Sequence, residues 1–201
     1  MSLSQSHVAL SYEGPVPPMF LEEFRQAVDV EALDLRIEPR PSGRAMASID
    51  WLMPTALLAY VGKAYFDVFL EDIAKSHLDA LKRGIKTLGR RMGEVRYGRV
   101  ASRGKLPAAD LYSPLFSLWT DRDEGGRFKM LVANGLSQAQ AETVMDAYMT
   151  FIQAYHTGAL DPEDLAVLAE ARPLGGVVLL DYDLASASIQ VVDPLAAIRA
   201  S

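Results

Sequence analysis

Histidine is the side chain best suited to acid–base chemistry near neutral pH, and this chain has three. His77 lies in a segment with the pattern of an amphipathic helix, and it could act as a general base if a carboxylate oriented its ring. His156 falls in the last turn of another predicted helix, where the helix dipole favours an imidazolium. A lone histidine on a helix is more typical of a hydrogen-bonded structural residue. We therefore assign no catalytic residue, and a carboxylate site assisted by His77 stays an alternative hypothesis.

Metal and cofactor chemistry has little support in the sequence. The chain contains no cysteine, which excludes disulfides and thiolate ligands. Asp121, Asp123 and Glu124 resemble a fragment of a calcium-binding loop, but the twelve-residue spacing and the terminal glutamate are missing. The motifs GxSxG, GxGxxG, HExxH and the P-loop are also absent. We expect no metal site and no cofactor.

Positive charge is concentrated in one block. Residues 82–105 contain nine of the twenty basic residues and one acidic residue, whereas the whole chain has a net charge of −6. Such a block favours a contact surface for a polyanion. The alternative is internal compensation by the acidic segments on either side of it. The candidate partner-binding residues are Lys82, Arg83, Lys86, Arg90, Arg91, Arg96 and Arg99.

An acidic protein is the partner that this pattern favours. Binding to nucleic acid would favour aromatic side chains interleaved with the basic ones, and in this block Tyr97 is the only one. An anionic membrane is a second alternative, and self-association stays open. The first residues show neither the basic nor the apolar region of a signal peptide, so we expect a cytoplasmic, bacterial protein.

A nearly unbroken apolar run, residues 51–70, precedes the basic block. With the amphipathic pattern that follows, it predicts one long helix over about residues 54–92, with Gly84 and Gly89 favouring a bend near its end. The length of the run also suits a membrane-inserting helix over residues 54–72. Lys63 and Asp67 oppose that alternative, because a charge near the centre of a spanning helix costs about 2.5–3.5 kcal/mol.

The remaining elements are predicted from apolar periodicity and turn residues. Helices are expected over residues 18–29 and 138–157, and a short helix opens at Asp161. Alternating apolar residues predict strands near residues 8–12, 33–37 and 95–100, a hairpin at 115–132 and another at 177–192. This order predicts a single α+β domain with a largely antiparallel sheet, packed against the long helix and the amphipathic helix 138–157.

Together these features favour a non-enzymatic binding module of the adaptor or immunity type, with residues 82–105 as its contact surface. A membrane-acting effector and an enzyme with a carboxylate or His77 site are the alternatives.

Overall fold

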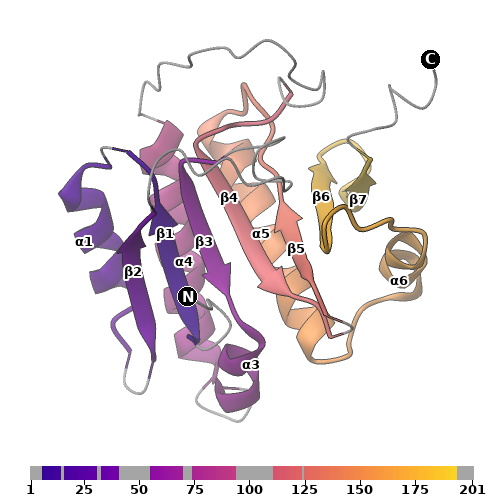
Figure 1. Cartoon of the computed structure of the whole chain (residues 1–201), viewed down its shortest axis with the longest axis horizontal. Coiled ribbons are helices and arrows are strands. Elements are labelled where there is room, and N and C mark those ends of the chain that lie inside the picture. Colours follow the sequence, from indigo (N-terminus) through magenta and orange to yellow (C-terminus); the bar gives the residue numbers. More distant parts are fainter. Residues whose placement is uncertain are drawn as a thin grey trace.

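The computed structural model describes residues 6–14, 16–30, 33–40, 55–69, 74–93, 111–123 and 125–193. In this part of the chain, a seven-stranded mixed sheet has the order β2-β1-β3-β4-β5-β6-β7, and helices pack against it (Figure 1). The α+β class is therefore confirmed. The elements are β1 (Val8–Tyr12), α1 (Pro18–Ala27), β2 (Leu35–Pro39), β3 (Leu57–Val61), α3 (Lys63–Phe69), α4 (Ala74–Gly93), β4 (Phe116–Asp121), β5 (Arg127–Met130), α5 (Gln138–His156), α6 (Pro162–Ala169), β6 (Val177–Asp183) and β7 (Ser188–Val192).

Three β-α-β units build the sheet. The pairs β1–β2, β3–β4 and β5–β6 are parallel neighbours, and a helix lies between the two strands of each pair in the chain. The pairs β1–β3, β4–β5 and β6–β7 are antiparallel. A largely antiparallel sheet was thus the wrong expectation, because half of the strand pairs are parallel crossovers, which need a long connection such as a helix.

The long helix over residues 54–92 is wrong as well. Leu57–Val61 is the strand β3, which lies between β1 and β4 and is buried at all five positions. A strand covered on both faces is apolar throughout, so its sequence lacks the alternation that marks a half-exposed strand. Helix α4 follows separately and continues through Gly84 and Gly89 without interruption.

Helices α1, α4 and α5 contribute to the main core on one face of the sheet. Their buried side chains include Phe24, Leu81 and Tyr148, which pack with strand residues such as Leu57 and Leu118. Helices α4 and α5 lie side by side (Figure 1). A smaller cluster around Tyr60, Trp119 and Leu179 lies on the other face.

The other predicted elements are confirmed with small shifts of their ends. Helix 18–29 is α1, helix 138–157 is α5, and the two hairpins are β4–β5 and β6–β7. The predicted strand at 95–100 lies outside the described residues. None of the described helices is long and apolar enough to span a bilayer.

Candidate functional site

Helix α4 has a buried face and a basic face. Leu81, Ile85, Leu88 and Met92 repeat every three or four residues and are at most 2% exposed. Such a stripe holds the helix against the core. The opposite face carries four basic side chains that are partly or fully exposed, Lys82, Arg83, Lys86 and Arg90, and begins with the exposed acidic Asp79.

Arg91 is bound within the chain. Its Nε and Nη2 atoms donate to the two carboxylate oxygens of Glu23 on α1, at 3.0 and 2.8 Å. The hydrogen bond from this guanidinium lowers the pKa of Glu23. The guanidinium also lies 5.6 Å from the ring centre of Phe20. Arg91 therefore joins α4 to α1, and much of its charge is compensated there.

Lys86 is bound on the other side of the helix. Its ammonium forms an ion pair with Asp146 of α5. The alternative of internal compensation thus applies to two of the seven candidates. Lys82, Arg83 and Arg90 form no ion pair with the residues that the structure describes, while Arg96 and Arg99 lie outside them.

A cleft of about 470 Å³ opens between the C-terminal half of α4 and the N-terminal half of α5. Lys86 and Arg90 line it from α4, so two of the candidate residues border a concave site. Gly89 and Asn134 also form part of its wall. Its apolar lining comes from the two helices, from the start of β4 and from the loop after β5: Met92, Leu115, Phe116, Val132, Leu136, Ala141 and Met145.

The first turn of α5 is capped by its own side chains. Ser137 and Gln140 form a reciprocal capping box, in which each side chain accepts a hydrogen bond from the backbone N–H of the other residue. The side chain of Gln138 donates to Glu142 at 2.9 Å. Gln138 and Glu142 both line the cleft, so α5 contributes a carboxylate to a wall to which α4 contributes two basic side chains.

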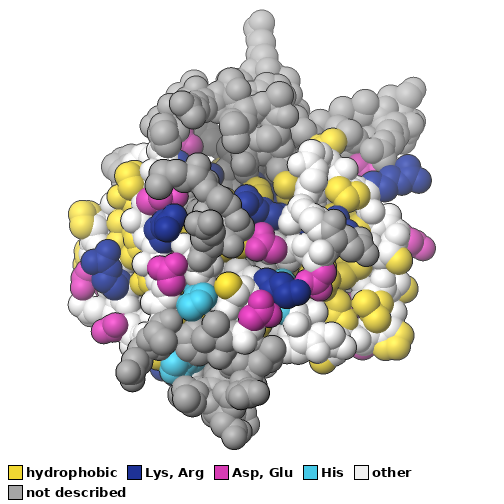
Figure 2. Space-filling view, turned by 60° about the horizontal axis from the view of Figure 1, so that its bottom comes forward, with side chains coloured by type: hydrophobic (Ala, Val, Ile, Leu, Met, Phe, Trp, Pro, Cys, Tyr) yellow, Lys and Arg dark blue, Asp and Glu magenta, His cyan; other side chains and the backbone are white. Residues whose placement is uncertain are grey.

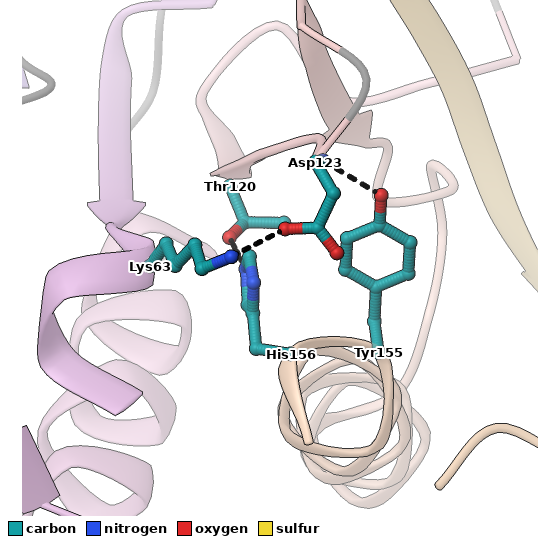
Figure 3. A network of polar contacts seen from close by, with 5 residues as sticks. All are labelled: Lys63, Thr120, Asp123, Tyr155 and His156. Carbon is teal, nitrogen blue, oxygen red and sulfur yellow. Dashed lines mark hydrogen bonds and ion pairs between the residues drawn. The ribbon is translucent and has the colours of Figure 1, made fainter. Parts of the chain in front are cut away.

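A second polar cluster lies at the opposite end of α5 (Figure 3). Lys63 Nζ donates to Asp123 Oδ1 at 2.9 Å, and the backbone N–H of Asp123 donates to the Tyr155 hydroxyl at 2.9 Å. His156 Nε2 lies 2.8 Å from Thr120 Oγ1, and its ring stacks on Phe66 at 5.0 Å between ring centres. Residues from α3, α5 and the β4–β5 hairpin meet here.

The contact between Thr120 and His156 resembles a nucleophile with its base, but the direction of the hydrogen bonds opposes that role. Thr120 is fully buried, and its hydroxyl donates to the carbonyl oxygen of Val61 at 2.7 Å. The hydroxyl has one proton, so it must accept from His156 Nε2–H. A base would have to take this proton rather than supply one. The contact between Thr120 and His156 is therefore a structural hydrogen bond.

This tautomer also explains the electrostatics of the ring. His156 Nδ1 is buried, and no group of the described residues hydrogen-bonds to it. Burial lowers the pKa of His156 and outweighs the opposite effect of Asp123. The direction of this pKa shift is opposite to the one expected from the helix dipole.

The remaining sequence candidates are placed as follows. His77 is buried on the core side of α4, where it is 8% exposed and does not line the cleft. Asp121 binds the Tyr60 hydroxyl and lies 3.6 Å from Arg127 Nε. Within the described ranges, no three acidic or histidine side chains are grouped as metal ligands.

Figure 2 shows the end of the molecule that carries α3. Acidic and basic side chains alternate on this face, with histidine among them. Mixed charge of this kind neutralises itself locally, unlike the basic face of α4.

No known family model matches the chain, and neither a curated protein nor a solved structure matches it.

Proposed function

We propose that this protein is a non-enzymatic binding module that docks an acidic partner protein on the outward face of α4. The observation that carries the proposal is the charge of Lys82, Arg83 and Arg90, which no described acidic side chain neutralises by an ion pair. Cations on an exposed helix face accelerate the encounter with an acidic partner, and added salt reduces this acceleration.

The shape of this charge favours a narrow acidic segment over a wide anionic surface. The basic residues are confined to one helix, and carboxylates flank it on both sides: Glu22 and Glu23 on α1, Glu142 and Asp146 on α5. A membrane or a nucleic acid duplex would bring its phosphates near those carboxylates. An acidic helix or loop lying along α4 would avoid this repulsion.

The protein would act as an adaptor or an immunity protein in the bacterial cytoplasm, and the partner would be its target. It can be identified with a photo-crosslinking amino acid placed at Arg83. The same amino acid at Arg172, an exposed basic residue in the segment after α6, is the matched control. A protein captured from position 83 and absent from position 172 is then purified for kinetics.

Association is measured for Arg83→Glu and Arg90→Glu, with Arg172→Glu as a control of equal charge change. At about 20 mM salt, where screening is weak, we expect the two α4 variants to associate at least about threefold more slowly than the control. The difference should shrink near 300 mM salt, because the screening length is then below about 8 Å. Equal association rates in low salt would show that α4 is not the contact.

A further inference from the structure

Two glycines of α4 differ in the reason for their presence. A Cβ atom on Gly84 would lie 2.7 Å from Val28 Cγ1 and 3.3 Å from the Phe24 ring, so the close approach of α1 requires glycine there. Among the described residues, a Cβ on Gly89 would meet only Met145, at 3.7 Å from its Cγ, which is ordinary contact. Packing therefore explains Gly84 and does not explain Gly89.

Gly89 nevertheless lowers the stability of the helix. Glycine inside a helix loses more backbone entropy than alanine does, and alanine would fit at this position. Gly89 lines the cleft, where the absence of a side chain keeps the wall of α4 open. A position that favours space over helix stability, next to an apolar lining, is typical of a binding site.

The charges and exposed surface around the cleft indicate what it would hold. Arg90 lines the cleft without an ion pair to a described residue, while Lys86 is bound to Asp146. Leu111 is 64% exposed, and its carbonyl oxygen accepts from the backbone N–H of Asn134 in the cleft wall. The site thus combines a cation without an ion pair to a described residue, one carboxylate (Glu142), a part-apolar lining and an exposed leucine beside it.

We infer that the cleft between α4 and α5 binds an apolar side chain from an acidic segment of the partner, while a neighbouring carboxylate of that segment pairs with Arg90. The inference rests on the proposed function and adds the anchor to it. The volume of about 470 Å³ lies in the range of sites that enclose a small ligand or a few side chains. Side chains that fill well-packed pockets usually supply most of the binding free energy of an interface.

The probe for this inference is a phage-displayed library of random peptides, selected on the wild-type protein. We expect enrichment of peptides in which one large apolar residue is flanked by Asp or Glu. A synthetic peptide of this kind should bind Gly89→Leu about tenfold or more weakly than wild type, because the new side chain fills the cleft without changing its charge. Gly89→Ala is the smaller change at the same position, and it should weaken binding less.

Methionine methyl groups report on the cleft even if Gly89→Leu folds poorly. Met92 and Met145 line the cleft, whereas Met149 is buried in the core and does not line it. When the peptide is added, the methyl resonances of Met92 and Met145 should shift and that of Met149 should stay. Replacing the apolar residue of the peptide by Ala should abolish the shifts.

The possible failures are distinguishable. Binding that is lost in Arg83→Glu but unchanged in Gly89→Leu, without shifts at Met92 and Met145, overturns the anchor and leaves the basic contact of the proposed function. Binding unchanged in both variants overturns both. Three further results would also overturn the inference: selection of peptides without acidic residues, the absence of any enriched peptide, and methyl shifts that follow protein concentration alone. The last result would indicate binding of a second copy of this chain.

Discussion

At the C-terminal end of α5, His156 and Tyr155 hydrogen-bond to Thr120 and Asp123, and the Asp123 carboxylate is neutralised by Lys63. At its N-terminal end, Arg90 borders a cleft without an ion pair to any described residue. The two ends are separated by 19 helical residues, roughly 28 Å at about 1.5 Å per residue. The closed end contains the groups that resemble an active site, but they bind one another. At the other end, Arg90 forms no ion pair with a described residue, and that is where the ligand that we propose would bind.

The closed end should be the more sensitive to loss of one hydroxyl group. Thr120→Val keeps the shape of the side chain but leaves both His156 Nε2–H and the Val61 carbonyl without this partner. We expect the free energy of unfolding to fall by roughly 2–4 kcal/mol, since each buried unsatisfied group costs about 1–3 kcal/mol. Urea unfolding measures this change. Thr120→Ser, which keeps the hydroxyl, should lose less than half as much; equal losses would mean that the hydrogen bonds are not the cause.

The two glycines of α4 should respond with opposite signs to the same substitution. Gly84→Ala should lower the free energy of unfolding by about 1–3 kcal/mol, because the new methyl overlaps Val28. Gly89→Ala should raise it by about 0.5–1 kcal/mol, because the cleft has room and alanine is the better helix former. Thermal or urea unfolding of both variants tests this contrast. If Val28→Ala restored no stability to Gly84→Ala, the overlap with Val28 would not be its cause.

Gly84 and Gly89 also show what sequence alone could reach. Both are visible as glycines in an amphipathic pattern, but only the neighbours brought by the fold separate the one that packs from the one that does not. Likewise, the basic residues were identifiable by composition. Which of them stays available depends on Glu23 and Asp146, which lie on other helices.

The fold was predictable where apolar periodicity and turn residues marked an element clearly, and it was not predictable where these signals were missing. Apolar periodicity predicted α5 over residues 138–157, and two alternating segments predicted the β4–β5 hairpin within residues 115–132. Leu57–Val61 has no such alternation, because this central strand is buried at all five positions. The segments that cover it are distant in sequence, so the local sequence does not reveal them. A short apolar run cannot be assigned to helix or strand by periodicity, and Gly62 directly after it was the available sign that it ends.

Lowering the pH should have a smaller effect on the free energy of unfolding, through His156 at the closed end. Burial holds the pKa of His156 below its ordinary value of 6.5, against the nearby carboxylates of Asp67, Asp121 and Asp123 and in line with Lys63. As pH falls below about 6.5, the unfolded chain takes up this proton before the folded protein does, so stability decreases. Above that pH the contribution is constant.

His156→Gln isolates this term, since glutamine can still donate to Thr120 but does not titrate in this range. The free energy of unfolding is measured for both proteins between about pH 5 and 7.5, so that the effects of other groups cancel in the difference. We expect the wild type to lose stability more steeply than the variant on acidification. Parallel curves would contradict a buried neutral imidazole.

The smallest difference is expected between two lysines on the basic face of α4. Lys86 pairs with Asp146, whereas Lys82, one turn earlier, has no ion pair among the described residues. Lys86→Gln should lower the free energy of unfolding by about 0.5 kcal/mol, which is typical of a partly exposed ion pair, and Lys82→Gln should change it by less. A double-mutant cycle with Asp146→Asn confirms the origin of the effect, because the coupling should be absent for Lys82 and should shrink for Lys86 in salt. If Lys82 coupled to Asp146 as strongly as Lys86 does, its charge would be compensated within the chain, and less of the basic face would remain for a partner.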